Sequence, residues 1–277
     1  MRLGYLGPAG TFSEDAVRSG PESDGAELVA LRTVRDTVMA VHDGTVDRAV
    51  VPIENSLEGP IGVTLDTLAE EHDVTIVGEL VLAVSPCLIA RQPMALEEIE
   101  RVVSHPQPLA QCARFLRDKL PAAEVVSATS TAEAVRVVVA AQARWAALGT
   151  ARAAELYGAT VLADGVEDEP GNATRFVWLA RAPSERDASR PAKTSLAFWG
   201  SGDDSPGWLV RCLSEFAFRG VNLTKIESRP LRAQLGHYRF FVDCEGDARD
   251  AAVAEAVAGL KAHCERVQVL GSYPAAE

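Results

Sequence analysis

The strongest constraint on the fold of this chain is an alternation of short apolar runs with helically spaced segments along residues 1–181. The apolar runs predict strands at residues 3–6, 28–31, 48–53, 79–90, 101–104, 124–126, 145–148 and 174–179. The helical spacing predicts helices at residues 34–42, 61–71, 109–119 and 132–144. The run at 79–90 should be broken near Pro86, since proline cannot donate a ladder hydrogen bond. Such alternation is typical of an α/β fold with a largely parallel sheet.

The pattern changes after residues 182–193, which are rich in proline, serine and charged residues and predict a linker. Beyond it, the predicted order is strand, helix, strand, strand, helix, strand, at residues 194–199, 206–219, 223–227, 236–244, 251–264 and 266–270. This βαββαβ order is that of the ferredoxin-like unit. Because its single sheet exposes an edge, the unit favours pairing with a second copy.

Charge and residue spacing disfavour several classes of function. The formal net charge is −12 and lysine and arginine form no cluster, so a nucleic-acid partner is not expected. The five histidines lack metal-ligand spacing, so no metal site is expected. The sequence also lacks the patterns of serine hydrolases (G-x-S-x-G), P-loop NTPases and dinucleotide-binding enzymes (G-x-G-x-x-G).

Cysteine usage and hydropathy predict a cytoplasmic protein. The five cysteines are scattered, with no C-x-x-C pair, which is typical of reduced thiols in a reducing compartment. The first residues lack the basic and then apolar pattern of a signal peptide. The most apolar stretch, residues 80–90, is too short to cross a membrane, so no membrane partner is expected.

Polar segments follow several predicted strands, and ligands bind at such strand ends in open α/β sheets. In the string GPAGTFSE, which starts at Gly7, Thr11 and Glu14 fit a capping box at the start of a helix. This helix start either serves as a plain cap or binds an anion through its free N–H groups and its positive dipole end.

The string SHPQPLAQC, which starts at Ser104, also joins a predicted strand to a predicted helix. Gln107 and Gln111 are four residues apart, so both can lie on one helix face. His105 could act as a general acid or base. A lone histidine beside proline is, however, more typical of a structural hydrogen bond, and this interpretation is favoured.

Two further strings place polar residues at strand ends. VPIENS puts Asn55 and Ser56 directly after a strand, either as a plain turn or as hydrogen-bonding contacts for a ligand. NATRF puts Thr174 and Arg175 at the start of a strand. Arg175 can bind a carboxylate in bidentate fashion, and the Thr174 hydroxyl can donate to a leaving oxygen.

Taken together, these strings resemble the prephenate dehydratase family. The matching strings are GPAGTFSEDA from Gly7, VPIENSLEG from Val51, SHPQPLAQC from Ser104, NATRF from Asn172 and NLTKIESRP from Asn222. They occur in the family's order and spread over nearly the whole chain, so the combination is far more specific than any single string. The C-terminal βαββαβ unit resembles an ACT domain, a module that binds amino acids at subunit interfaces.

The resemblance implies two α/β lobes arranged like a periplasmic binding protein, with the active site in the cleft between them. The catalytic domain would cover residues 1–181, with residues 1–73 and 161–181 in one lobe and residues 74–160 in the other. The ACT domain would cover residues 194–273. The implied activity is that of a carbon–oxygen lyase that converts prephenate to phenylpyruvate in L-phenylalanine biosynthesis, without a cofactor.

The resemblance also implies roles for individual residues. Thr174 corresponds to the family's essential threonine, and Arg175 and Phe176 complete its Thr-Arg-Phe motif. Arg175 is expected to bind a substrate carboxylate. The other expected substrate-binding residues are Thr11, Ser13, Asn55, Ser56, Ser104, Gln107 and Gln111. Glu54 and His105 are reserve candidates for the general acid.

Two segments of the C-terminal unit correspond to the family's effector motifs. The expected effector-binding residues are Gly207, Trp208, Leu209, Val210, Asn222, Leu223, Glu227, Ser228, Arg229 and Pro230. The first motif usually reads Gly-Ala-Leu-Val, so Trp208 places a bulky indole where the family has a small side chain. Phenylalanine is the expected effector of a homodimer or homotetramer, and Trp208 leaves the effector's identity and the sign of its effect open.

Two other functions stay open at this point. An arogenate dehydratase would carry out the same reaction on an amino-acid analogue of prephenate, and turnover on the two substrates would separate these enzymes. A non-catalytic amino-acid sensor would combine the same folds without turnover. The intact Thr174-Arg175-Phe176 motif favours an enzyme over a sensor.

Overall fold

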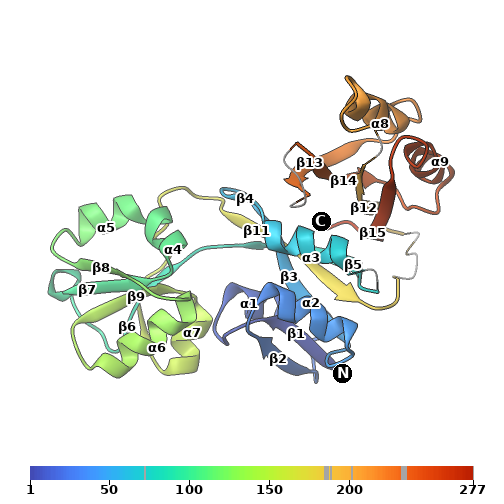
Figure 1. Ribbon diagram of the computed structural model, residues 1–277. Helices are drawn as coiled ribbons and strands as arrows, with labels where there is room; N and C mark the ends of the chain where they lie inside the picture. The colour runs from blue at the N-terminus through green and yellow to red at the C-terminus, as the bar shows by residue number, and fades with distance from the viewer. Residues whose placement is uncertain (72, 184–186, 188, 201, 232–235, 277) are drawn as a thin grey trace. The chain divides into compact units, whose positions relative to one another are not determined.

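The computed structural model describes residues 1–71, 73–183, 187, 189–200, 202–231 and 236–276. They form two compact units: unit 1 comprises residues 1–37, 55–58 and 82–174, and unit 2 comprises the described residues of 38–54, 59–81 and 175–277. Helices and strands occur in both units (Figure 1). The α/β class predicted from the sequence is therefore confirmed. No helix in the described part of the chain is long and apolar enough to span a membrane.

Unit 1 contains a five-stranded sheet in the order β10-β6-β9-β7-β8. Its strands are β6 (Cys87–Ala90), β7 (Arg101–Ser104), β8 (Glu124–Ser127), β9 (Trp145–Gly149) and β10 (Thr160–Ala163). Strand β7 runs parallel to β8 and β9, whereas β6 runs antiparallel to β9 and β10. This sheet is mixed, and the prediction of a largely parallel sheet is wrong for it.

Helices cover both faces of this sheet. Successive side chains of a strand point to opposite faces, so neighbouring residues pack against different helices. Ile89 and Val103 pack in one core with residues of α6 and α7, and their neighbours Leu88 and Val102 pack in a second core with residues of α4 and α5. The helices of unit 1 are α1 (Phe12–Ser19), α4 (Pro106–Gln111), α5 (Ala113–Lys119), α6 (Thr131–Ala141), α7 (Ala151–Tyr157) and the 3₁₀ turn η1 (Leu96–Glu98). Strands β1 (Arg2–Leu6) and β2 (Glu27–Leu31) run parallel to each other.

Unit 2 contains two sheets. In the first, β3 (Arg48–Asn55), β11 (Ala173–Ala180) and β5 (Thr75–Ala83) follow one another in that order, and β4 (Gly59–Pro60) pairs with β3. Helix α2 (Val34–His42) precedes β3 in the chain, and α3 (Gly62–Glu70) lies between β4 and β5. Strands β3 and β11 are therefore direct neighbours, although they lie far apart in the sequence.

The second sheet is C-terminal and has the order β13-β14-β12-β15, with antiparallel neighbours throughout. Its strands are β12 (Ala192–Trp199), β13 (Leu223–Pro230), β14 (Tyr238–Glu245) and β15 (Arg266–Pro274), and its helices are α8 (Trp208–Ala217) and α9 (Ala251–Leu260). The βαββαβ order predicted from the sequence is confirmed, and it is the order of a ferredoxin-like unit.

The two faces of the C-terminal sheet differ in chemical character. Leu196 and Val242 belong to the apolar core that α8 and α9 share with the sheet. Their sequence neighbours Ser195 and Asp243 must point to the opposite face, which the helices leave uncovered. Both of these polar residues are nevertheless buried.

Some predicted elements differ from the structure in extent. The run at 79–90 is two strands, β5 and β6, which belong to different sheets. The helix predicted at 109–119 begins at Pro106, which is tolerated because the first helical residue needs no N–H donor, and it breaks at Cys112. The sequence pattern misses α7 and β10. The predicted linker at 182–193 includes residues 184–186 and 188, which lie outside the described residues.

Candidate active site

Three polar side chains meet where β3 ends and β11 begins. Asn55 is the last residue of β3, and Thr174 is the second residue of β11. The Asn55 amide nitrogen lies 3.0 Å from the Thr174 hydroxyl oxygen and 2.9 Å from the side-chain oxygen of Asn172. We call Asn55, Asn172 and Thr174 the amide–threonine cluster.

The orientation of Asn55 determines what the Thr174 hydroxyl can do. The Asn55 side-chain oxygen accepts hydrogen bonds from the backbone N–H groups of Leu57 and Glu58, at 3.0 and 3.1 Å. Its amide NH₂ must therefore face Thr174, so the Thr174 oxygen acts as acceptor. The hydroxyl hydrogen of Thr174 is left to donate elsewhere, and a substrate oxygen is a suitable acceptor.

Two more predicted residues join this cluster. Asn172 donates to the Gln111 side-chain oxygen at 3.1 Å, and Gln111 in turn donates to the Glu58 carboxylate at 3.4 Å. The Ser56 hydroxyl accepts from the backbone N–H of Ala173 at 3.0 Å. The structure therefore brings together Asn55, Ser56, Gln111 and Thr174. The sequence interpretation omits Asn172 as a site residue, although it opens the NATRF string.

Burial strengthens the hydrogen bonds of the amide–threonine cluster. Asn55 and Asn172 are 3% exposed and Thr174 is 9% exposed. In such surroundings the local dielectric is low and linked hydrogen bonds polarise one another. A hydroxyl that accepts from an amide becomes a better donor, which is the property needed to stabilise negative charge on a departing oxygen.

The GPAGTF loop leads into α1 with a different cap from the one predicted. Thr11 occupies the N-cap position, but its hydroxyl donates to the Leu6 carbonyl and caps no helix N–H group. The Glu14 carboxylate accepts from the Gly10 N–H at 2.6 Å and binds Arg18 at 2.7 Å. The predicted capping box between Thr11 and Glu14 is therefore wrong, because the loop turns one residue earlier, at Gly10, which has φ +86°.

The same loop contacts the start of α7 within unit 1. The Thr150 hydroxyl donates to the Gly10 carbonyl at 2.8 Å and caps α7 by accepting from the Ala153 N–H at 2.9 Å. A Cβ atom at Gly10 would lie 3.1 Å from the Cβ of Ala153. Position 10 thus needs glycine both for its left-handed conformation and for close packing. Ser13, in the first turn of α1, is buried.

Two residues at the start of the string SHPQPLAQC make hydrogen bonds to the protein backbone. Ser104 is fully buried, and its hydroxyl donates to the Leu148 carbonyl at 2.7 Å. His105 caps α4, and its Nδ1 accepts from the Gln107 N–H at 3.4 Å. The structural interpretation of His105 is confirmed. Ser104 is engaged with the backbone, whereas Gln111, at the end of the same helix, reaches the amide–threonine cluster.

Arg175 lies in a buried ionic network in unit 2. Its guanidinium donates to Glu79 at 2.6 Å, to Asp243 at 2.6 Å and to the Tyr273 hydroxyl at 2.9 Å. Lys193 adds a second cation at 2.6 Å from Glu79. The sequence predicts that Arg175 binds a substrate carboxylate, but protein groups already engage its guanidinium. Phe176, the third residue of the motif, is 2% exposed and packs in the interior.

The Glu79 carboxylate makes the stability of unit 2 dependent on pH. Burial alone would raise the pKa of Glu79, but Arg175, Lys193 and the N–H of Ala276 lower it below its usual value of 4.5. A depressed folded-state pKa contributes stability above about pH 4.5, and this contribution is lost as the pH falls through the folded-state pKa.

We expect the stability difference between wild type and Glu79→Gln to be largest near neutral pH and to shrink below about pH 4.5. The reason is that protonation removes from the wild type the same charge that the substitution removes. Urea unfolding of both proteins between about pH 7 and about pH 3 measures this difference. A difference that stays constant over this range would contradict the assignment.

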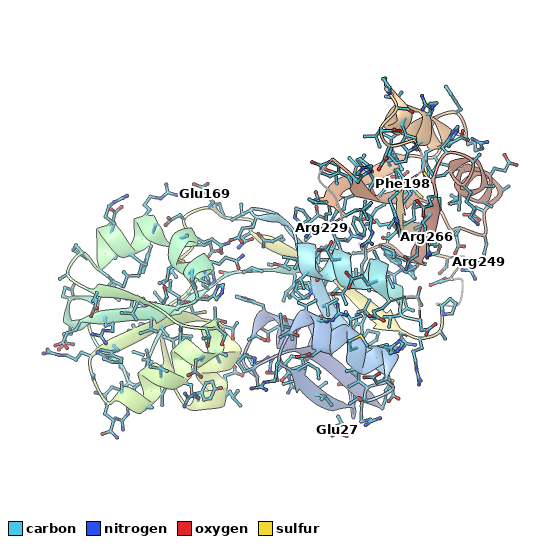
Figure 2. All side chains as sticks on the ribbon, viewed as in Figure 1. Glu27, Glu169, Phe198, Arg229, Arg249 and Arg266 are labelled. Carbon is cyan, nitrogen blue, oxygen red and sulfur yellow. The ribbon has the colours of Figure 1, made fainter. Side chains whose placement is uncertain are left out.

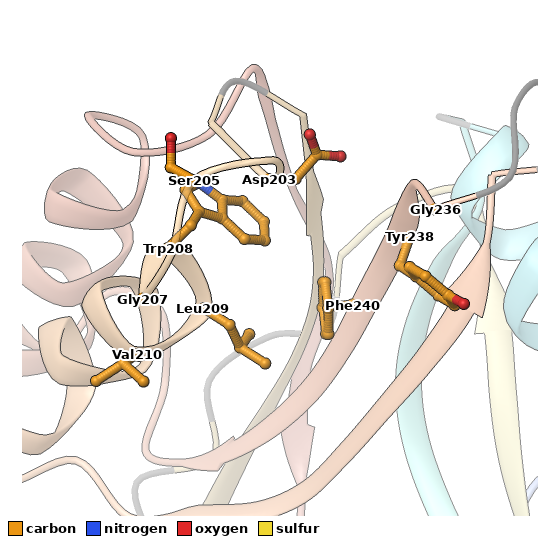
Figure 3. A pocket seen from close by; sticks show the side chains of 9 residues that line it. All are labelled: Asp203, Ser205, Gly207, Trp208, Leu209, Val210, Gly236, Tyr238 and Phe240. Atoms are coloured by element: carbon orange, nitrogen blue, oxygen red, sulfur yellow. The ribbon is translucent and has the colours of Figure 1, made fainter.

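The predicted effector segments belong to two different elements of the C-terminal unit, the start of α8 and the strand β13. The Trp208 indole is turned into the core of its own unit, where its Nε1 donates to the His263 carbonyl at 2.7 Å. Its ring lies 6.0 Å from that of Phe198 and 5.8 Å from that of Phe240. Figure 3 shows the indole beside Phe240, with Val210 directed away from both. Trp208, Val210 and Phe240 border a pocket of about 260 Å³ at the start of α8.

The second effector segment runs along β13. Asn222 donates to the Glu245 carboxylate at 3.0 Å. Figure 2 labels Arg229 among the side chains drawn on the ribbon. Arg229 makes a bidentate ion pair with Asp66 of α3, at 2.7 and 2.8 Å. Leu223, Glu227, Ser228 and Pro230 belong to the same strand. In the part of the chain that the structure describes, no group of three or more His, Cys, Asp or Glu residues is placed to hold a metal ion.

Comparisons with known proteins give one family match and several similar proteins. The model of the prephenate dehydratase family matches residues 3–184. A prephenate dehydratase from Mycobacteroides abscessus is 43% identical over 280 residues, which cover 99% of this chain and 90% of the relative. The fold is similar to that of prephenate dehydratase from Arthrobacter aurescens in complex with L-Phe, with a TM-score of 0.90 and 36% identity over 99% of this chain and 90% of that one.

Another similar structure has a different description. GqqA, described as a novel type of quorum-quenching acylase, matches with a TM-score of 0.88 and 30% identity over 99% of this chain and 98% of that chain. The similarity therefore includes proteins for which two kinds of reaction are named.

Proposed function

The chain belongs to the prephenate dehydratase family, and on that premise we propose that it converts prephenate to phenylpyruvate with loss of carbon dioxide and water. The observation that carries this proposal is the hydrogen bond from Asn55 to the Thr174 hydroxyl. It leaves Thr174 as a buried donor with a free hydrogen. Departure of a hydroxyl group from an uncharged ring carbon needs such a donor.

For the proposed reaction, the protein must orient the substrate and place one hydrogen-bond donor at the leaving oxygen. The bond between the ring and its carboxylate breaks, and its electron pair moves through the ring and expels the hydroxyl group as the ring becomes aromatic. The leaving oxygen takes a proton from solvent and departs as water. Thr174 stabilises the developing charge on this oxygen by a hydrogen bond, which is worth on the order of 3 kcal/mol for one well-placed donor.

We assign the two substrate carboxylates to groups other than Arg175, because protein partners engage its guanidinium. Backbone N–H groups at the start of α1, near Thr11 and Ser13, suit an anion through their positive dipole end. Gln107 and Gln111 supply further donors. Arg175 then binds protein groups and not the substrate. Ser104 stabilises the end of β7, just before α4, through its hydrogen bond to the Leu148 carbonyl.

Ultraviolet absorbance of phenylpyruvate, followed after addition of prephenate, tests the proposed function. We expect turnover by the wild type and a much smaller rate for Thr174→Val. Arogenate offered in a parallel assay separates the two dehydratase activities. Wild-type protein that leaves both substrates unchanged would contradict the proposal and favour an amino-acid sensor.

The similarity to GqqA makes an acylase the second candidate function. Amide hydrolysis by a hydroxyl nucleophile needs an adjacent base to remove its proton. Thr174 instead accepts from the Asn55 amide, and the Nδ1 of His105 accepts from a backbone N–H. These contacts favour a hydrogen-bond donor at position 174 over a nucleophile. An N-acyl amide substrate, tested beside prephenate, separates the two.

We further propose that residues 192–274 form an ACT domain whose effector is L-phenylalanine. The βαββαβ order supports the domain assignment, and the L-Phe complex of the Arthrobacter aurescens enzyme supports the ligand. The effector would bind between two copies of the chain. Exposed apolar side chains on this unit, including Val210 at 66% and Ile226 at 50%, support a homodimer or homotetramer.

Titration calorimetry is expected to show that the wild type binds L-phenylalanine, because the Trp208 indole packs into the core of its own unit, where its Nε1 donates to the His263 carbonyl. Trp208→Ala is expected to destabilise the unit by about 3–5 kcal/mol rather than open a binding site. Tyrosine and tryptophan serve as comparison ligands. Wild type that binds none of the three, beside a folded Trp208→Ala variant that binds phenylalanine, would show that the indole blocks the site.

A further inference from the structure

The helix-free face of the C-terminal sheet carries polar side chains that solvent does not cover. Ser195, Asp243 and Tyr273 come from the adjacent strands β12, β14 and β15, and each is at most 5% exposed. The Ser195 hydroxyl donates to Asp243 at 2.5 Å and contacts the Tyr273 hydroxyl at 2.6 Å. Because Ser195 has one hydrogen, Tyr273 is the donor in the second contact. Buried polar groups of this kind require partners.

Their partner is Arg175, from the neighbouring sheet of unit 2. Asp243 and the Tyr273 hydroxyl accept from its two terminal nitrogens, and Glu79 accepts from its Nε. Three protein groups therefore bind the guanidinium, and two of them, Asp243 and Tyr273, belong to the C-terminal sheet. Tyr273 is completely buried, and burial followed by the charge of Asp243 raises its pKa, so its hydroxyl stays protonated. We call Arg175, Glu79, Ser195, Asp243 and Tyr273 the Arg175 cluster.

Arg175 and Thr174 link the Arg175 cluster to the amide–threonine cluster, because they are neighbours in one strand. Arg175 follows Thr174 in β11, and Glu54 precedes Asn55 in β3. Since successive side chains of a strand point to opposite faces, Thr174 and Asn55 share one face of this strand pair and Arg175 and Glu54 share the other. The ion pairs agree: Glu54 lies 3.5 Å from Arg175 and 3.0 Å from Lys225 of β13.

We infer that Asp243 and Tyr273 are positioning residues for the proposed dehydration, acting through Arg175 on Thr174. They hold the guanidinium, and the guanidinium holds the start of β11, from which the Thr174 hydroxyl projects. Misplacement of a reacting group by about 1 Å can cost about 100-fold in rate. This inference rests on the proposed function.

The test compares kcat and KM for prephenate in Asp243→Asn, Tyr273→Phe and wild type. Asp243→Asn is nearly isosteric, and we expect it to lower kcat about 10- to 100-fold with KM changed by less than about threefold. Tyr273→Phe is expected to have a smaller effect of the same kind. The matched control is Thr194→Ala in β12, which removes buried hydrogen bonds to the Gly246 carbonyl and Ser272 without a contact to Arg175. Its kcat should stay near that of the wild type.

A double-mutant cycle separates positioning from general damage to the fold. If Asp243 acts through Thr174, Asp243→Asn should have little further effect on kcat in a Thr174→Val background. Additive losses, or an Asp243→Asn variant with wild-type kcat, would overturn the inference while the active wild type still supports the proposed function. Wild type that leaves prephenate unchanged would overturn the proposed function and, with it, the inference.

Discussion

Replacement of Thr174 by valine is expected to lower kcat for prephenate about 100- to 1000-fold, with KM changed by less than about threefold. Valine keeps the shape of threonine and removes the hydroxyl that accepts from Asn55 at 3.0 Å. The lost hydrogen bond is one that strengthens as the substrate oxygen gains negative charge, so the loss should fall on turnover rather than on binding. Steady-state kinetics followed by phenylpyruvate absorbance measures both constants.

Two further variants make this experiment specific. Thr174→Ser keeps a hydroxyl and should retain much more activity than Thr174→Val. Thr67→Val removes a buried hydroxyl in α3 that donates to the Val63 carbonyl at 2.8 Å, and its kcat should stay near that of the wild type. A folded Thr174→Val protein with near-normal turnover would remove Thr174 from the mechanism.

Replacement of Arg175 by methionine is expected to lower the free energy of unfolding by about 3–5 kcal/mol. The substitution leaves Glu79 and Asp243 buried together without the guanidinium that bridges them. The Glu79 side chain is 1% exposed and that of Asp243 is 7% exposed, so water cannot compensate. Urea unfolding followed by circular dichroism measures the change.

Arg175→Lys tests whether charge alone is sufficient. Lysine keeps the positive charge but lacks the planar fork that reaches Glu79, Asp243 and Tyr273 together, so an intermediate loss of stability is expected. Arg136→Met is the control, because Arg136 pairs with Glu133 on an exposed helix face and should contribute little. An Arg175→Met protein as stable as the wild type would contradict the description of the network as a buried, mutually dependent set of charges.

The sequence by itself predicted most of the elements and several polar residues that the structure brings together. The βαββαβ order beyond residue 190 is visible because each element carries its own local period of apolar residues, and that period is a property of neighbouring residues. The strings VPIENS, SHPQPLAQC and NATRF placed Asn55, Gln111 and Thr174 at strand and helix ends. In the structure Asn55 donates directly to Thr174, and Asn172 connects Asn55 to Gln111.

Only the tertiary structure decided which polar groups are partners. Asn55 and Thr174 are 119 residues apart, and Asp243 and Tyr273 lie 68 and 98 residues from Arg175. A local sequence pattern cannot predict partners so far apart in the chain, because burial and pairing depend on which strands become neighbours. The sequence therefore predicted Arg175 as a cation for a substrate carboxylate, and in the fold its guanidinium is the centre of a buried network. Likewise, the sequence left open how Trp208 affects the effector, and packing turned its indole into the core of its own unit.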